Sequence, residues 1–412
     1  MSEALHGALR IALLTHSVNP RGGVVHTLEL AQALHQAGHR VTVMAPATAG
    51  QAFFRPLPCP VELIPVGPAS RDMTEMVGAR IQAIERHVLG WLEAGHAFDV
   101  LHAQDAIGAN ALANLRDRGL ISGFVRTVHH LDHFDDPRLM AWQTRGFLAA
   151  SQVLCVSRLW QSVLRQEHGL EAALVHNGVD TLRYSRVPEP CDQQVRQRHG
   201  LVAGQAHGAP LFLMVGGVEE RKNTLRVLEA FIQIRHDLPG AQLAIVGGAS
   251  LLNHDDYVQQ FSATLQASGL PIGPGQAVVI TGAVPDRDMP ALFRAADALL
   301  MPSVREGFGL VVLEALASGT PVVVSRIAPF TEYLDDTDCT WADPMSVASI
   351  ARAMHEVLKH KASADTLARE PPDVCRRFSW PASAQRHAAL YRAFHSLREL
   401  PHARHALSPS LA

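Results

Sequence analysis

Short apolar runs alternate along this chain with segments of helical periodicity. In the first part of the chain these runs are LRIALLTHS at 9–17, RVTVMAP at 40–46, DVLHAQ at 99–104, FVRTVHH at 124–130 and QVLCVS at 152–157. A helical pattern at 25–37 separates the first two of them. Alternation of this kind indicates βαβ units, and therefore a mostly parallel sheet that is covered by helices.

The alternation stops after NGVD at 177–180 and starts again near residue 209. A polar segment rich in Pro and Gly lies between, and the later runs are LFLMVGG, QLAIVGG, AVVITG, DALLMPS and PVVVS. We therefore predict an α/β fold with two Rossmann-like αβα domains that face each other across a cleft. The predicted boundaries are a first domain at 1–185, a linker at 186–208, a second domain at 209–378, a helix at 379–397 that returns to the first domain, and a tail at 398–412.

Composition excludes several classes of protein. The chain of 412 residues is long enough for about two domains, and its net charge of -3 does not favour nucleic acid as a partner. Its five cysteines lie far apart without a CxxC pair, which favours free thiols in a reducing compartment, so we expect a cytoplasmic protein. The sequence shows neither the pattern of a signal peptide nor that of a membrane span.

Two loops that follow predicted strands carry features suited to phosphate. Gly22 and Gly23 open the first helix, where backbone N–H groups and the helix dipole can receive an anion. The turn is not GxGxxG, and taken alone a Gly-Gly turn is more often plain turn chemistry. In the second domain, Arg221 and Lys222 stand at the start of a helix predicted near Asn223. A basic pair at this end of a helix suits a bound anion; the alternative is a solvated pair that balances neighbouring glutamates.

The stretch EGFGLVVLEALASGTPVVVS places two glutamates in an otherwise apolar region. Glu306 is predicted on a loop, Glu314 inside a helix that ends at Gly319, and the helix N-terminus near Leu310 is expected to face phosphates. Carboxylates placed in this way can accept hydrogen bonds from the hydroxyls of one extended polyhydroxylated ligand. The alternative is a structural cation partner for each carboxylate.

These motifs, in this order, resemble the retaining GT-B glycosyltransferases of family 4, also called glycosyl transferases group 1. The resemblance covers nearly the whole chain. Besides the E-x7-E element from Glu306 to Glu314 and RKN at 221–223, the matching pieces are GG at 22–23, TVHH at 127–130, CVS at 155–157, NGVD at 177–180, AIVGG at 244–248, TGAVPDRDMPALFRAADALLMPS at 281–303 and FSW at 378–380.

The resemblance implies a role for each matching residue. Glu314 would bind the ribose of a nucleotide sugar, and Arg221 and Lys222 would hold its diphosphate. Donor sugar hydroxyls would be bound by Glu306 and by the backbone of the residues that follow it. The remaining implied contacts are Gly22 and Gly23 at the phosphates, His129 near the C6 hydroxyl of the sugar, Gly282 and Val284 beside the base, and Gly307, Phe308, Gly309 and Leu310 in the donor loop.

The implied activity is a metal-independent, retaining transfer of a sugar from a nucleotide-diphosphate donor to a hydroxyl acceptor, whose identity stays open. UDP or GDP is the expected nucleotide of this co-substrate, and no cofactor is implied. Preorganised cations and N–H donors would stabilise the departing diphosphate. The alternatives are another GT-B enzyme, such as a nucleotide-sugar epimerase or a phosphorylase, and a non-catalytic nucleotide-sugar-binding protein.

Two segments are not explained by the donor site. The segment HHLDHFDD at 129–136 is rich in metal-ligand side chains, but it is predicted as a loop, and we favour an acceptor-site or solvated loop without metal. A helical stripe of apolar residues at 73–91 is expected in the core, with a weak peripheral membrane contact as the alternative.

Overall fold

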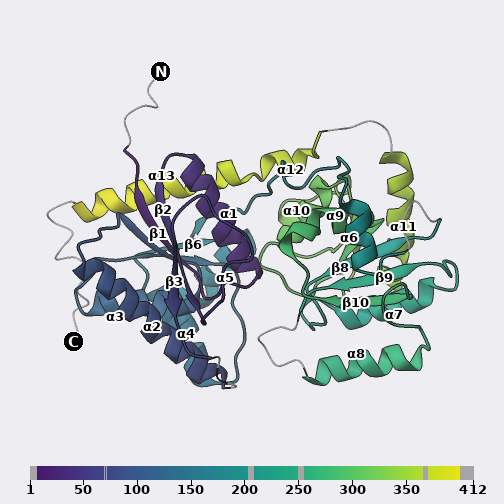
Figure 1. Cartoon of the computed structure of the whole chain (residues 1–412), viewed down its shortest axis with the longest axis horizontal. Helices are drawn as coiled ribbons and strands as arrows, with labels where there is room; N and C mark the ends of the chain where they lie inside the picture. The colour runs from purple at the N-terminus through teal and green to yellow at the C-terminus, as the bar shows by residue number, and fades with distance from the viewer. Residues whose placement is uncertain are drawn as a thin grey trace. The chain divides into compact units, whose positions relative to one another are not determined.

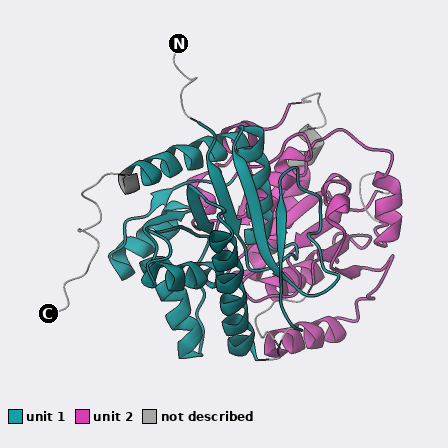
Figure 2. Ribbon diagram, turned by 60° about the vertical axis from the view of Figure 1, so that its left-hand side comes forward, with its two compact units in different colours: residues 1–177, 380–412 teal, residues 178–379 magenta. Residues whose placement is uncertain are grey.

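The computed structural model describes residues 7–68, 70, 72–202, 208–248, 255–364 and 370–399. Two compact units make up the chain, one of residues 1–177 and 380–412 and the other of residues 178–379 (Figure 2). Most of the predicted tail, and 203–207 of the predicted linker, lie outside the described residues. The remainder of that linker includes helix α6 (Asp192–Arg198), and the division between units falls after Asn177 rather than after residue 185.

A seven-stranded parallel sheet forms the centre of the first unit (Figure 1). The strand order is β3-β2-β1-β4-β5-β6-β7. The strands are β1 (Arg10–Leu14), β2 (Arg40–Ala47), β3 (Val61–Pro65), β4 (Val100–Ala103), β5 (Val125–Val128), β6 (Gln152–Cys155) and β7 (Ala173–Leu174). The order reverses between β1 and β4, so the loops that follow these two strands lie at a switch point, where such sheets bind ligands.

Polar residues begin most helices of the first unit. Asp72, Asp105, Asp136 and Ser157 are N-caps whose side chains accept backbone N–H bonds of the first turn. The helices are α1 (Gly22–Gln36), α2 (Met73–Glu93), α3 (Ala106–Asp117), α4 (Pro137–Leu148) and α5 (Arg158–His168). The apolar stripe of α2 packs into the core through Ile81, Ile84 and Val88, and Val77 and Trp91 pack against it.

Helix α13 (Trp380–Glu399) belongs to the first unit although it ends the described chain. It packs against α1 (Figure 1), and its Tyr391 hydroxyl is hydrogen-bonded to His102 Nδ1 of β4 over 2.6 Å. No helix among the described residues is both long and apolar enough to cross a membrane.

The second unit contains a six-stranded parallel sheet of order β10-β9-β8-β11-β12-β13. Its strands are β8 (Leu211–Val215), β9 (Gln242–Val246), β10 (Val278–Gly282), β11 (Ala298–Met301), β12 (Val322–Ser325) and β13 (Thr340–Ala342). The helices besides α6 are α7 (Thr224–Ile234), α8 (Asp255–Ala267), α9 (Met289–Ala295), α10 (Leu310–Ala317), α11 (Val347–Ala364) and α12 (Asp373–Arg377), with 3-10 turns η2 (Asp286–Asp288) and η3 (Phe330–Glu332). Here the order reverses between β8 and β11.

Candidate active site

The loops that follow β8 and β11 meet at the switch point of the second sheet. The two strands are paired in parallel, so their carboxyl ends lie side by side. The loops are joined by a backbone hydrogen bond, from Val304 N–H to the carbonyl of Arg221, over 3.0 Å. This pairing brings together the basic pair and Glu306, which are more than eighty positions apart in the chain.

Glu306 receives both cations on one oxygen. Arg221 Nη1 donates to Glu306 Oε1 over 2.8 Å and Lys222 Nζ donates to the same atom over 2.6 Å. Ser303 Oγ lies 3.3 Å from this oxygen, and Arg221 Nε also binds Glu219 Oε1 over 2.9 Å. With Glu306 only 6% exposed, these contacts provide the cation partner that a buried carboxylate needs.

Burial lowers the pKa of Lys222, against the opposing effect of the Glu306 charge. The cluster of Arg221, Lys222, Glu219 and Glu306 has equal numbers of positive and negative groups. An anionic ligand could therefore replace Glu306 as the partner of Arg221 and Lys222. These two cations are already held close together, and folding has already removed most of their hydration, so binding the ligand adds little desolvation cost.

Backbone geometry holds the basic pair at the strand end. Asn223, fully buried with a φ of 66°, donates from Nδ2 to the carbonyls of Pro302 and Pro344, over 2.9 and 2.7 Å. This side chain ties the loop before α7 to the loop after β11, which explains why an Asn occupies a left-handed position. Gly216 has a φ of 133°, and an added Cβ there would lie 3.0 Å from Lys222 Cε.

The donor loop predicted from the sequence leads into α10 through a left-handed glycine. Gly309 has a φ of 93° and is the N-cap of α10, and a Cβ on it would come within 2.6 Å of Phe330. Phe308 stacks on Tyr333, whose hydroxyl donates to the Phe308 carbonyl over 2.9 Å. Because Gly309 has no side chain to cap the helix, the N-terminus of α10, which begins at Leu310, is left to other acceptors.

Glu314 lies inside α10, as the sequence predicted, and is 8% exposed. Its charge acts on Arg183, which forms a 2.7 Å ion pair with Asp286. Although burial opposes the charged form, Tyr184, Asp286 and Glu314 together hold the pKa of Arg183 above its ordinary value. Glu314 therefore has a cation nearby, but that cation is shared with another carboxylate.

Gly282 and Val284 lie at the end of β10, which is separated from β8 by β9. Gly282 has a φ of 67°, and its carbonyl accepts a 2.9 Å hydrogen bond from Gly247 N–H in the loop after β9. The two residues are thus on the same sheet edge as the charge cluster, two strands away from β8.

In the first unit, Gly22, Gly23 and His129 come together. The two glycines are the first residues of α1, and the N-cap Arg21 makes no side-chain cap hydrogen bond. A Cβ on Gly23 would lie 3.6 Å from His129 Cδ2, so the glycine allows the histidine of the loop after β5 to approach the helix N-terminus. His129 Nε2 lies 3.3 Å from Gln104 Oε1, in the loop after β4.

His129, itself half-buried, lies beside buried histidines of the first unit. Its ring lies edge to face with that of His26 at 4.6 Å, and His26 Nδ1 is 2.8 Å from Asn177 Oδ1. Burial lowers the pKa of His26 to about 3 and holds that of His129 well below its ordinary value. At neutral pH these rings are therefore uncharged, and His129 can serve as a neutral hydrogen-bonding group.

The histidine- and aspartate-rich segment is a loop, as expected. His130 and Asp132 lie 3.1 Å apart, and His133 and Asp135 lie 3.9 Å apart with both side chains largely exposed. Asp136 instead caps α4. Among the residues that the structure describes, no group of three or more His, Cys, Asp or Glu side chains is arranged to hold a metal ion.

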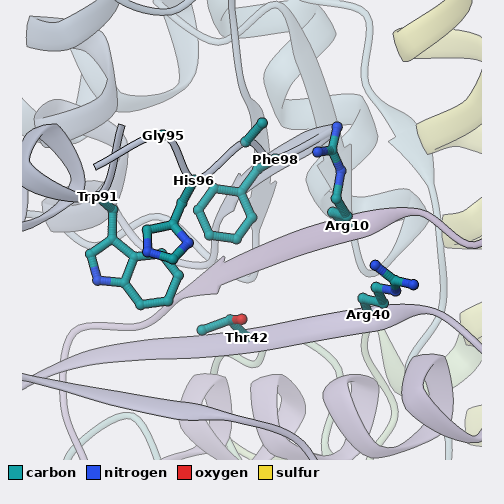
Figure 3. Close-up of a pocket in the computed structure, with 8 residues that line it drawn as sticks. Arg10, Arg40, Thr42, Trp91, Gly95, His96 and Phe98 are labelled. Carbon is teal, nitrogen blue, oxygen red and sulfur yellow. The ribbon is translucent and has the colours of Figure 1, made fainter. Parts of the chain in front are cut away.

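A separate pocket lies at the amino-terminal edge of the first sheet, where β1 and β2 begin, opposite the carboxyl edge that carries Gly23 and His129 (Figure 3). Its volume is about 330 Å³. Trp91, His96 and Phe98 form one wall, with Trp91 stacked on Phe98, and Arg10 and Arg40 lie on the other side (Figure 3). None of the predicted site residues lines it, so it does not change the site assignment.

The sequence missed the residues that hold the charge cluster together. Ser303 follows β11 and Asn223 precedes α7. They are the last residues of the matching pieces 281–303 and 221–223, but neither was assigned a role. The contacts of the charge cluster join the loop after β8 to the loop after β11, and these loops are adjacent only because the two strands are neighbours in the sheet. Besides these matching pieces, the available signal was their position at the ligand-binding edge of a parallel sheet, Ser303 just after a strand and Asn223 just before a helix.

Comparison with known families assigns both parts of the chain. Residues 20–183 match the model described as Glycosyltransferase Family 4, and residues 202–370 match the model described as Glycosyl transferases group 1. A phosphatidyl-myo-inositol mannosyltransferase of Mycobacterium leprae is 28% identical and is matched over 93% of this chain and 96% of its own length. A mannosylfructose-phosphate synthase of Agrobacterium fabrum is 23% identical, over 90% and 86% of the respective chains.

Solved structures share the fold over nearly the whole chain. A sucrose-phosphate synthase from Thermosynechococcus elongatus has a TM-score of 0.75 at 22% identity, covering 94% of this chain and 99% of its own. Anabaena HepE in complex with UDP and glucose has a TM-score of 0.70 at 19% identity, covering 95% and 100%. The two parallel-sheet units and these similarities confirm the predicted GT-B fold.

Proposed function

Because this chain belongs to the group 1 glycosyltransferases, we propose that it is a retaining enzyme that moves a sugar from a UDP or GDP sugar to a hydroxyl acceptor without a metal ion. The observation that carries the proposal is the cluster in which Arg221 and Lys222 both bind Glu306 at the carboxyl edge of the second sheet. One relative is named as GDP-mannose-dependent, and one structural neighbour was solved with UDP-glucose, which supports these two nucleotides.

In the proposed donor complex, Arg221 and Lys222 hold the diphosphate. Glu306, with the backbone of 307–309, binds sugar hydroxyls as the cations turn toward the phosphates, and Glu314 binds the ribose. The uncapped N-terminus of α10 at Leu310 supplies further N–H donors. Gly282 and Val284 flank the base. In the first unit, Gly22 and Gly23 offer N–H groups to the phosphates and the neutral ring of His129 binds the sugar near its C6 hydroxyl.

The proposed chemistry needs no protein nucleophile. As the anomeric bond breaks, negative charge grows on the diphosphate, where fixed cations and N–H donors stabilise it most. The acceptor would attack from the face of the leaving group, and a phosphate oxygen would help to remove its proton. This arrangement retains the anomeric configuration, and Glu306 and Glu314 do not act as the acid and base of a hydrolase.

We expect one nucleotide sugar to raise the melting temperature of the protein and to be slowly hydrolysed without acceptor. UDP-, GDP- and ADP-sugars would be screened by thermal shift, and each stabilising donor would then be incubated with the protein while the release of free nucleotide is followed. Binding with no release of nucleotide, with or without added hydroxyl compounds, would favour the non-catalytic binding protein. Inversion at C2 of the sugar, or phosphate-dependent cleavage, would favour the epimerase or the phosphorylase.

Glu314→Ala is expected to weaken nucleotide binding by roughly 1–3 kcal/mol, because hydrogen bonds between the ribose hydroxyls and a charged carboxylate are lost. Isothermal titration calorimetry with UDP and GDP measures this change. Glu356→Ala is the matched control, since Glu356 is an exposed glutamate of another helix, α11, in the same unit. Equal affinities for Glu314→Ala and the parent would reject the ribose assignment.

A further inference from the structure

Two arginines share one aspartate at the carboxyl edge of the first sheet. Arg80 extends from α2, Asp105 follows β4, and Arg126 lies in β5. Arg80 Nη1 donates to the carbonyl of His16 over 3.2 Å, and His16 Nδ1 lies 3.6 Å from Asp105 Oδ2. The charge of Asp105 acts on both arginines.

The charges of this group do not balance. Burial tends to raise the pKa of Asp105, but contacts with His16 and Gly108 and the charge of Arg126 leave it below its ordinary value, so Asp105 is ionised. Burial lowers the pKa of Arg126 to about 10 and also lowers that of Arg80, and both remain protonated at neutral pH. Two cations therefore share one carboxylate.

Of the two cations, Arg126 has the higher free-energy cost of burial. Its side chain is in a strand, the residue is 6% exposed, and its guanidinium donates to the carbonyl of Thr127. Its Nε is buried without a hydrogen-bond partner. Throughout the described ranges, neither Arg80 nor Arg126 has a carboxylate within 4.0 Å. A buried guanidinium with this little compensation is destabilising unless a ligand brings negative charge.

The surrounding groups do not supply that charge. Burial keeps His102 and His129 neutral by lowering their pKa values, and both rings lie within electrostatic range of Arg126. From α4, Arg145 adds another cation, which is paired with Asp117 over 2.8 Å. The partly exposed carboxylate of Asp132 is in contact with His130. The excess positive charge is thus left to a ligand.

We propose that this edge of the first unit binds an acceptor that carries a phosphate group, an inference that rests on the proposed glycosyl transfer. Arg80, which is partly exposed, contacts the phosphate oxygens with its planar fork, and Arg126 attracts the same group through the low-dielectric interior. The carboxyl ends of β1, β4 and β5 are adjacent, which is where open parallel sheets bind ligands. The phosphate belongs either to a soluble sugar or polyol phosphate or to a lipid headgroup.

The test compares each phosphate ester with its neutral parent compound. Glucose 6-phosphate, myo-inositol 1-phosphate, glucose and myo-inositol would be titrated into the full chain by calorimetry, and vesicles of phosphatidylcholine with and without phosphatidylinositol would be used in co-sedimentation. Variants are Arg80→Gln, Arg126→Met and the charge-retaining Arg126→Lys. Arg145→Gln is the control, because it removes a partly exposed arginine of the same unit that already has its own carboxylate.

We expect at least one phosphate ester to bind about tenfold or more tightly than its neutral counterpart, as hydrogen bonds to charged groups would give. Arg80→Gln and Arg126→Met should remove this preference, while Arg126→Lys and Arg145→Gln keep it. A preference confined to the soluble esters, or to the vesicles with phosphatidylinositol, identifies the source of the phosphate. If Arg126→Met fails to fold, Arg80→Gln decides.

Equal binding of esters and neutral compounds by the parent protein would overturn the proposal, as would a preference that survives Arg80→Gln. These outcomes are independent of the proposed function. Donor hydrolysis by the parent protein is measured separately. If the protein releases nucleotide from the donor but shows no preference for phosphate esters, the proposed glycosyl transfer stands and only the phosphate-bearing acceptor is rejected.

Discussion

Replacing Arg221 and Lys222 together with alanine is expected to lower kcat at least about 100-fold, while the affinity for the donor falls much less. The reason is that these cations interact most strongly with the diphosphate as it departs, when its negative charge is greatest. Steady-state kinetics with the donor identified by the screen gives kcat and KM, and calorimetry gives the donor affinity directly.

The same substitution leaves Glu306 and Glu219 without their observed cation partners, so stability must be followed as well. The control is Arg165→Ala with Arg376→Ala, which removes two cations from largely exposed ion pairs and makes the same change in net charge. A melting temperature close to that of the parent would show that lost turnover is a catalytic effect. Unchanged turnover in a folded Arg221→Ala, Lys222→Ala protein would remove the pair from the mechanism.

Acidification from pH 7 to pH 5 is expected to destabilise the protein by several kcal/mol, because the first unit buries neutral histidines. Burial lowers the pKa of His387 to about 4 and that of His26 to about 3. The pKa of a histidine in the unfolded chain is near 6.5, so below that pH these histidines bind protons in the unfolded chain but not in the folded one. Each such histidine costs about 2 kcal/mol at pH 5 and nothing above pH 7.

Urea unfolding at pH 7.5, 6 and 5 measures this loss. His387 extends from α13 with its Nδ1 2.9 Å from the Ser383 carbonyl, and its ring is 6.1 Å from that of His26. His387→Gln should therefore reduce the slope of stability against pH between 5 and 6.5. His133→Gln, at a side chain that is 84% exposed, should leave the slope unchanged. A free energy of unfolding that is constant from pH 7.5 to 5 would contradict the assignment of neutral buried histidines.

Local patterns predicted much of the second unit. The helix that contains Glu314 was expected from its apolar run between Leu310 and Gly319, and the structure confirms α10 at Leu310–Ala317 with a left-handed glycine beyond it. These features depend on helix periodicity and on residues that can adopt positive φ, and both are legible in a short stretch of sequence.

The contacts between loops could not be predicted in the same way. For Glu306, the sequence leaves two kinds of partner open, sugar hydroxyls or a structural cation. The structure places two cations on it, because β8 and β11 are neighbours in the sheet although β9 and β10 lie between them in sequence. Strand order is decided by the packing of whole βαβ units, not by any residue in the loops. Arg126 was missed for a similar reason. Its strand is recognisable from neighbouring apolar residues, whereas the lack of a carboxylate within 4.0 Å of it among the described residues depends on segments that are distant in sequence.

The stereochemistry of the product tests the central claim most directly. Proton NMR would measure the anomeric coupling constant of the product formed from an α-linked donor, once in EDTA and once with added manganese. If Arg221, Lys222, Gly23 and the N-terminus of α10 supply the positive field, a divalent ion is redundant, and we predict an α-linked product in both conditions. A β-linked product would contradict retention, and complete loss of activity in EDTA would contradict metal independence and return attention to His129–Asp136.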